Sequence, residues 1–146
     1  MSDNHDDHHD HHNPGFLKKY VFSTDHKTIG LQYGLTAMCF LLFGFYLMMV
    51  MRWSIAYPNE PLPAWMSWLF TEDWKAQWLT EGKMPGQTYN MFGAMHGTIM
   101  VFLGIVPLGF GAFGNYVTPL QIGAPDMAFP KLNMWSYWLY VLGGVM

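Results

Sequence analysis

Long uncharged apolar segments alternate with polar ones along the 146-residue chain. The first covers residues 29–51 and is followed by Arg52. At about 1.5 Å per residue, a helix of that length crosses a hydrocarbon layer of about 30 Å. The second covers about residues 90–117, and a third, residues 133–146, is too short to cross. The pattern predicts an all-α membrane protein, a polytopic transmembrane helix bundle with two full spans and a truncated third.

Two local signals refine these spans. Ser23, Thr24 and Asp25 stand just before the first span and are residue types that cap helix N-termini. Pro107 falls near the middle of the second span, where it removes a main-chain donor. We expect a kink at Pro107, with the freed main-chain groups satisfied by neighbours.

The connection over residues 53–88 is polar overall but rich in tryptophan. A short helix over residues 64–79 would place four large apolar residues on one side: Trp65, Trp68, Leu69 and Trp78. We expect this helix to lie flat in the lipid headgroup layer, where tryptophan is enriched. Docking of a partner protein is the alternative.

The beginning of the chain carries two further patterns. Residues 1–13 are a low-complexity Asp/His segment, which we expect to be a disordered, solvated tail. Weak binding of a divalent metal such as copper by its histidines is the alternative. Residues 14–28 mix aromatic residues with lysines, as in a segment that lies along the membrane surface. We therefore divide the chain into a tail, 1–13, and a membrane part, 14–146.

Composition excludes several classes of protein. The chain is 51% hydrophobic and 12% charged, about half the charged fraction of soluble domains. The formal net charge is −3 and no basic stripe is present, so we expect contact with membrane lipid and none with nucleic acid. The single cysteine, Cys39, excludes an intrachain disulfide. We expect no signal peptide, and the distribution of lysine and arginine places the N-terminus in the cytoplasm.

His96 is the one histidine inside a long apolar run, where an ionisable residue needs a reason. On a wheel of about 100° per residue it shares its face with Tyr89 and other aromatic or methionine residues. Beside that face runs a glycine stripe, which consists of Gly93, Gly97, Gly104 and Gly111. Such a stripe admits either another helix or a flat macrocycle. His96 is therefore either a haem-iron ligand or a structural residue that hydrogen-bonds a neighbouring helix.

Asp126 is the only carboxylate downstream of Glu81, in a loop that Asn115 and Asn133 flank. These three polar side chains either order waters and take up protons at the mouth of the bundle, or cap helix ends and satisfy loop main chain. Arg52 also has two interpretations: an anchor at the membrane interface, or a buried cation that faces an anionic or polar group.

Three segments resemble a known family: FSTDHKTIG (22–30), YNMFGAMHGTIMVF (89–102) and GAFGNYVTPLQIGAPDMAFPKLN (111–133). They are similar to the start of subunit I of the haem–copper terminal oxidases, in particular cytochrome c oxidase. GAPDMAFP is the most specific of these motifs. The resemblance implies that residues 14–146 are the N-terminal part of such a subunit. The chain would then be a fragment of a longer polytopic protein or an incomplete gene prediction.

The resemblance also implies that part of a cofactor site lies in this chain. His96 corresponds to an axial ligand of the low-spin haem a iron, and Arg52 to an arginine hydrogen-bonded to the haem formyl group. Tyr89 matches a tyrosine seven residues before that ligand. The second haem a ligand and the ligands of haem a3 and CuB are implied to lie on later helices that this chain lacks. The chain alone is therefore expected to be inactive.

The resemblance implies a proton-pumping enzyme of a bacterial-type inner (cell) membrane. Electrons from cytochrome c pass through subunit II to haem a and then to a haem a3–CuB centre, where O2 becomes water; subunit III is a further partner. Asp126 corresponds to the entrance of the D proton pathway, and Asn115 and Asn133 correspond to asparagines along it.

Departures from the family pattern leave alternatives open. Ser54 stands where the family often has a glutamate linked to a calcium or sodium site, so that site is not expected here. A quinol oxidase of the same superfamily is the nearest alternative. The loop sequence APDMAFP, and Thr88 where those relatives have an additional histidine, favour cytochrome c as donor. A non-enzymatic membrane protein with a structural His96 is the alternative from another class.

Overall fold

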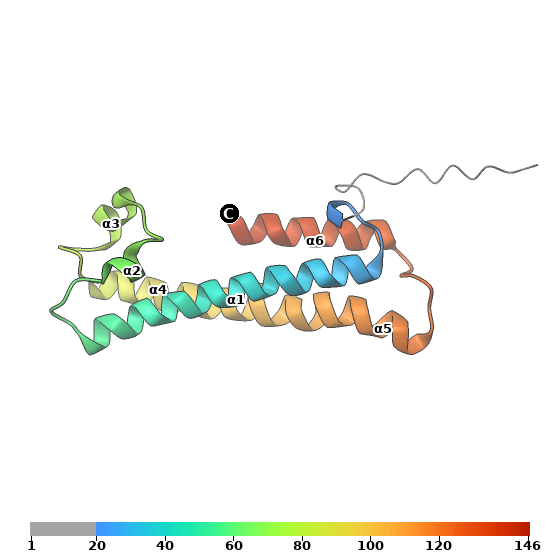
Figure 1. The fold of residues 1–146 in the computed structure, drawn as a ribbon, viewed down its shortest axis with the longest axis horizontal. Coiled ribbons are helices and arrows are strands. Elements are labelled where there is room, and N and C mark those ends of the chain that lie inside the picture. Colours follow the sequence, from blue (N-terminus) through green and yellow to red (C-terminus); the bar gives the residue numbers. More distant parts are fainter. Residues whose placement is uncertain (1–19) are drawn as a thin grey trace, which may run out of the picture.

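A computed structural model describes residues 20–146, and the predicted tail, 1–13, and residues 14–19 of the predicted surface segment lie outside that range. Two long helical segments run antiparallel, and a third helix packs against one half of them (Figure 1). Two short helices lie in the connection between the long segments, at the end of the hairpin away from the start of the third helix. The described chain is therefore a helical hairpin with a third helix beside it.

The first long helix, α1, covers His26–Ala56 and extends beyond the predicted span at both ends. It begins after Asp25, whose side chain accepts a hydrogen bond from the main-chain N of Lys27, so one of the predicted caps is confirmed. It ends at Tyr57, since the proline that follows disfavours helical backbone in the residue before it. The helix continues through Arg52, whose side chain is exposed.

The second long segment is one continuous helix over Gly86–Ile122. It consists of α4 (Gly86–Thr98), η2 (Ile99–Ile105), η3 (Pro107–Gly114) and α5 (Asn115–Ile122), of which η2 and η3 are π-helical. It begins directly after Pro85 and stops at Gly123, whose φ of 68° is a left-handed conformation that favours glycine. The predicted bounds, 90–117, were too short at both ends.

Pro107 lies inside this helix without ending it. The main chain here is π-helical, with the N–H of Val106 donating to the carbonyl of Val101, so the same pattern directs position 107 to the carbonyl of Phe102, and proline has no N–H for that bond. The hydroxyl of Tyr140 donates to the next carbonyl, that of Leu103, at 2.7 Å. Satisfaction of the carbonyl that Pro107 frees stays a prediction.

The third helix, α6, covers Pro130–Val145, and it begins earlier than the predicted Asn133. Proline is favoured in the first turn of a helix because its missing N–H would have no partner there, and its φ is already helical. Two hydroxyl pairs join α6 to α1: Tyr33 with Ser136 at 2.9 Å, and Thr36 with Tyr137 at 3.0 Å. These pairs fix the register of α6 on α1.

The prediction of one helix over residues 64–79 is wrong. The structure has two short helices, α2 (Ala64–Ser67) and α3 (Glu72–Trp78), separated by a turn. Thr71 starts α3 anew, because its hydroxyl accepts from the main-chain N of Trp74. Met66 is buried, while the neighbouring Trp65 and Trp68 are exposed. Placement of these tryptophans among lipid headgroups stays a prediction.

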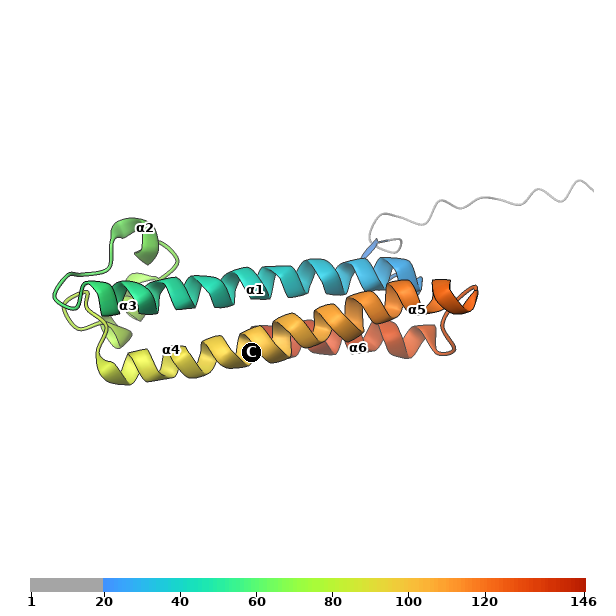
Figure 2. The same ribbon diagram turned by 90° about the horizontal axis from the view of Figure 1, so that it is seen from below.

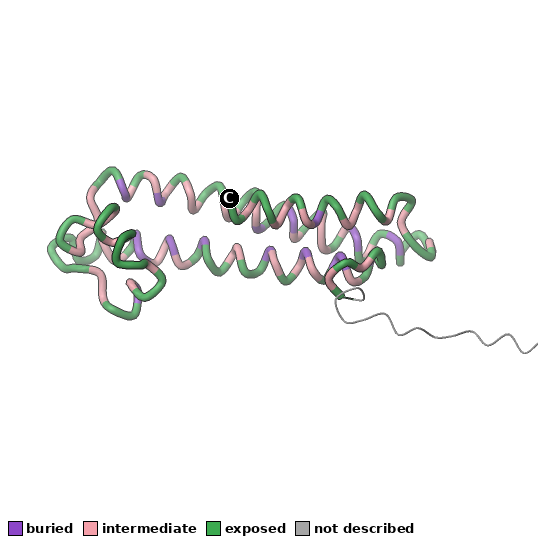
Figure 3. The backbone as a smooth tube through the Cα atoms, turned by 90° about the horizontal axis from the view of Figure 1, so that it is seen from above, coloured by how far each residue is buried: buried purple, intermediate pink, exposed green. Residues whose placement is uncertain are grey.

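The two long helices run alongside each other (Figure 2), and most of their residues are exposed or only partly buried (Figure 3). The two helices have mean hydropathies of 2.0 and 1.8 over their most apolar windows, of which only 28% and 11% is buried. Long apolar helices with exposed surfaces need lipid around them. Since the described chain is also helical throughout its regular structure, the predicted fold class, an all-α membrane protein, is confirmed.

Candidate functional site

The residues singled out from the sequence fall into two groups. His96 and Tyr89 lie on α4, which packs against the second half of α1, where Arg52 is found. Asn115, Asn133 and Asp126 belong to the other end of the bundle, where α1 begins, α5 ends and α6 begins (Figure 1). The molecule therefore has two candidate sites, one for each group.

His96 lies in the last turn of α4 and is half-buried. Its Nδ1 is 2.8 Å from the carbonyl oxygen of Gly44 on α1. A carbonyl only accepts hydrogen bonds, so the neutral ring carries its proton on Nδ1 and has its lone pair on Nε2. Among the described residues Nε2 has no hydrogen-bond partner and, unlike Nε2 of His26, it is not buried. The ring nitrogen left over is the one that a metal would bind.

The glycine stripe beside His96 is mostly covered by α1. A Cβ placed on Gly104 or Gly111 would lie 2.5 Å from the side chain of Leu41 or Tyr33 respectively. At Gly97, one residue after His96, it would meet nothing within 4 Å. A neighbouring helix, which was one of the two alternatives for this stripe, therefore covers Gly104 and Gly111. Space for a planar group, the other alternative, is open at Gly97, next to His96.

These features fit a haem with one axial ligand from this chain. The donor is a neutral imidazole with a free Nε2, and the space beside it is open. No group of three or more His, Cys, Asp or Glu side chains that could hold a metal ion occurs within residues 20–146. A metal in this site would therefore need ligands from elsewhere as well.

Tyr89 and Arg52 lie near the same end of the hairpin. Tyr89 is half-buried and packs against a core cluster that includes Leu47, Met51 and Phe92. Arg52 is exposed and lines a groove of about 400 Å³ with apolar neighbours on its own helix. The interpretation of Arg52 as a buried cation requires other residues to cover its side chain, and the described residues do not cover it.

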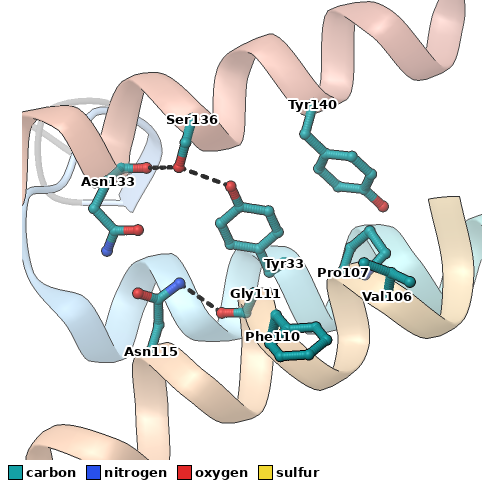
Figure 4. Close-up of a pocket in the computed structure, with 9 residues that line it drawn as sticks. All are labelled: Tyr33, Val106, Pro107, Phe110, Gly111, Asn115, Asn133, Ser136 and Tyr140. Carbon is teal, nitrogen blue, oxygen red and sulfur yellow. Dashed lines mark hydrogen bonds between the residues drawn. The ribbon is translucent and has the colours of Figure 1, made fainter. Parts of the chain in front are cut away.

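The second site contains a cavity of about 390 Å³ between α1, η3 and α6 (Figure 4). Its polar lining includes Asn115, which is buried, and Asn133, which is half-buried. Tyr33 from α1 and Ser136 from α6 add two hydroxyl groups to the same wall. The remaining lining is largely apolar: Val106, Pro107, Phe110, Gly111 and Tyr140. The structure thus brings the two predicted asparagines to one cavity.

The polar groups of this cavity are connected by hydrogen bonds (Figure 4). The Tyr33 hydroxyl is 2.9 Å from the Ser136 hydroxyl, which donates to the main-chain carbonyl of Asn133 at 2.7 Å. On the opposite wall, the Asn115 amide donates to the carbonyl of Gly111 at 2.6 Å. Asn115 thus binds main chain of its own helix, whereas the expected alternative was loop main chain.

Asp126 does not line the cavity, but its carboxylate contacts two groups beside it. Oδ1 lies 3.3 Å from Nδ1 of His26 and accepts a hydrogen bond from the main-chain N of Met127 at 2.7 Å. The Met127 sulfur in turn accepts from the Asn133 amide at 3.1 Å. The alternative that Asp126 caps α6 is wrong, because that helix begins after Phe129 with no side-chain cap.

Three residues of the second site were missed from the sequence. His26 is 4% exposed, with Nδ1 between Asp126 and Asp25 and with Nε2 buried and unpartnered among the described residues. Its position at the first residue of an apolar helix was a usable signal. Tyr33 and Ser136 carried no comparable signal, because single hydroxyl groups are ordinary in membrane helices.

Comparison with known proteins gives a consistent family. Residues 28–146 match the family described as cytochrome c and quinol oxidase polypeptide I. "Probable cytochrome c oxidase subunit 1-alpha" of Streptomyces coelicolor is 38% identical over 125 residues, which is 86% of this chain and 18% of that protein. "Cytochrome c oxidase subunit 1" of Thermostichus vulcanus is 39% identical over 120 residues, 82% of this chain and 18% of its own.

A further relative has the same name and a similar overlap. "Cytochrome c oxidase subunit 1" of Cereibacter sphaeroides is 38% identical over 141 residues, which covers 88% of this chain and 24% of that protein. The chain therefore spans about a fifth to a quarter of the length of these relatives.

Proposed function

The chain belongs to the cytochrome c and quinol oxidase subunit I family, and we propose that it is the N-terminal part of the catalytic subunit of a terminal oxidase. The whole enzyme would reduce O2 to water with electrons from cytochrome c and pump protons across a bacterial-type cell membrane. One observation carries this proposal: a neutral imidazole on a membrane helix has its Nδ1 engaged by main chain and its Nε2 free beside open space.

His96 is proposed as one axial ligand of a low-spin haem a. Bound haem supplies an iron centre that accepts and releases one electron. This chain's residues hold the group: His96 offers Nε2, Gly97 leaves room for the ring, and Tyr89 closes the adjoining core. Arg52, exposed at the same end of the hairpin, is proposed to hydrogen-bond a polar substituent of the ring. The second ligand, and the haem a3 and CuB ligands, would come from the rest of the longer protein.

The ligand role is tested in the full-length oxidase with His96→Ala and, as a control, His26→Ala. Both remove a histidine from the membrane domain, but only His96 has a free Nε2 beside open space. We expect the α-band of low-spin haem to be lost in His96→Ala and kept in His26→Ala. An unaltered spectrum in His96→Ala would refute the ligand assignment.

The second site is proposed to take up protons from the cytoplasmic side, with the N-terminus on that side. Asp126 is 47% exposed and stands at the mouth, held by His26. Asn133 and Asn115 line the cavity behind it. The Met127 sulfur, which separates the carboxylate from the Asn133 amide, does not carry protons, so the step between them requires water.

Proton uptake is tested by comparing Asp126→Asn with Asp25→Asn in oxidase reconstituted into vesicles. Both carboxylates lie near Nδ1 of His26, at 3.3 and 3.6 Å, and both are about half exposed. Asparagine also caps helices well, so Asp25→Asn keeps the start of α1. We expect Asp126→Asn to slow turnover and abolish pumping, and Asp25→Asn to leave both in place. Full pumping in Asp126→Asn would show that protons enter elsewhere.

Oxidase subunits II and III are the proposed partners, with cytochrome c as the electron donor. The position at which quinol-oxidising members have an additional histidine is Thr88, which is buried and donates to the Trp78 carbonyl at 2.8 Å. A comparison of turnover with reduced cytochrome c and with a quinol decides between the two donors. Faster turnover with the quinol would contradict the proposed donor.

A further inference from the structure

We propose that Gly44 is a positioning residue for His96: its carbonyl sets the tautomer and the plane of the imidazole so that Nε2 is the ligating nitrogen. This inference rests on the proposed role of His96 as a haem ligand. It assigns a function to a residue of α1 that makes no contact with the iron itself. The supporting observations are one hydrogen bond, one close side-chain contact and the accessibility of the two ring nitrogens.

The hydrogen bond joins two separate helices. Nδ1 of His96 on α4 lies 2.8 Å from the carbonyl oxygen of Gly44 on α1. Because the acceptor is main chain, its position is fixed by the helix, and it has no rotamers of its own. Rotation of the imidazole about its side-chain bonds would break this bond, so the ring plane is fixed as well. Partners of this kind orient a metal-binding histidine and raise its basicity.

Glycine at position 44 allows the two helices to approach this closely. A Cβ on Gly44 would lie 2.7 Å from the sulfur of Met100 and 2.9 Å from its Cγ. Met100 follows His96 by one helical turn, so the two side chains stand next to each other. Gly44 is buried beneath them. Hence the side chain that Gly44 lacks would occupy the space that Met100 now fills.

The opposite arrangement at His26 shows what the Gly44 carbonyl accomplishes. There Nδ1 faces two carboxylates, and Nε2 is buried without a partner among the described residues. At His96 the inner nitrogen is engaged by uncharged main chain and the outer nitrogen is accessible. Of the two histidines within residues 20–146, His96 alone therefore presents a free lone pair outward from the helix pair.

The experiment measures the midpoint potential of the low-spin haem in the full-length oxidase that carries Gly44→Val. Valine is chosen because it adds two methyl groups to a Cβ that would already lie 2.7 Å from the Met100 sulfur and 3.7 Å from Ile99. A longer hydrogen bond makes His96 a weaker base, which favours ferrous over ferric haem and raises the midpoint. A tenfold change in the ratio of the affinities of His96 for ferric and for ferrous haem iron corresponds to about 59 mV for a one-electron couple.

Two controls separate the hydrogen bond from general effects on packing. Gly34→Val changes the same helix where a Cβ meets only Ala112, at 3.5 Å, and should leave the midpoint unchanged. Met100→Ala alone should also leave it unchanged, and Gly44→Val with Met100→Ala should bring it back toward the original value. A midpoint that is the same in Gly44→Val as in the original protein overturns the proposal.

A second measurement applies if Gly44→Val does not assemble. In the unaltered oxidase with ¹⁵N-labelled histidine, magnetic resonance identifies which nitrogen of His96 carries the proton. A proton on Nδ1 in a hydrogen bond supports the proposal, and an unprotonated Nδ1 overturns it. The parent proposal fails separately: if His96→Ala retains the low-spin α-band, His96 is no ligand, whatever Gly44 does.

Discussion

Tyr140→Phe removes one hydroxyl from the bundle and leaves the aromatic packing in place. The lost hydroxyl donates to the Leu103 carbonyl, which lies one turn before the proline at position 107. The ring itself stacks on Tyr33 with centroids 5.4 Å apart, and phenylalanine keeps that contact. The substitution therefore isolates a single hydrogen bond of 2.7 Å.

The cost of Tyr140→Phe in free energy of unfolding follows from the apolar environment of this hydrogen bond. Hydrogen bonds between membrane helices contribute about 0.6 kcal/mol on average and up to about 1.7 kcal/mol. The Leu103 carbonyl would be left with one donor fewer in an apolar environment, so we expect a cost near the upper value. In a Pro107→Ala background, the restored main-chain N–H at position 107 allows α-helical pairing, in which it competes for the same carbonyl. There, Tyr140→Phe should cost less by at least about 0.5 kcal/mol.

The assay is a double-mutant cycle on the free energy of unfolding, measured in mixed micelles by titration with a denaturing detergent. Tyr137→Phe is the matched control, since the Tyr137 hydroxyl bonds the Thr36 side chain, 3.0 Å away on α1. Its cost should be the same with proline or alanine at position 107. If Tyr140→Phe also costs the same in both backgrounds, within about 0.3 kcal/mol, Tyr140 does not compensate for Pro107.

Two further predictions concern packing and the entrance. Gly111→Ala should cost about 1 to 3 kcal/mol in the same titration, because its Cβ would lie 2.5 Å from the Tyr33 ring. Gly109→Ala, in the same π-helix with nothing within 4 Å, should be neutral or stabilising by up to about 1 kcal/mol, and equal costs would contradict the packing account. His26→Leu should slow proton uptake severalfold, because Asp126 loses the partner at 3.3 Å, while stability changes by less than about 1 kcal/mol. Uptake at the original rate in reconstituted vesicles would show that His26 does not hold the carboxylate for that task.

The apolar pattern predicts where the helices lie better than where they end. α1 continues past the predicted limit because Arg52 is exposed and nothing disfavours helix until Tyr57 precedes a proline. The long second helix ends at Gly123, whose left-handed backbone is a stop signal that the run of apolar residues did not reveal. Thr71 similarly divides the Trp-rich segment, since its capping hydroxyl outweighs the amphipathic pattern.

Contacts between positions far apart in the chain were harder to predict from the sequence. His96 and Asp126 were selected because a single ionisable group near an apolar run is costly. That argument does not reveal that His26 lies against Asp126, since the two are 100 residues apart. Nor does it reveal the Gly44 carbonyl, because main-chain atoms leave no mark on residue type. The predicted roles of His96, Asp126 and the asparagines rest on the family resemblance and stay proposals.

The π-helical segments η2 and η3 change the main-chain pairing of the long helix without moving the face that packs on α1. A π turn joins residue i to i+5, so its carbonyls pair one residue further along than in an α-helix. The positions that face α1 nevertheless keep α-helical spacing, since Gly104 lies against Leu41, and Ala112 and Tyr116 lie against Gly30. Spacing counted from the histidine therefore identifies the packed face of this helix as far as the first turn of α5.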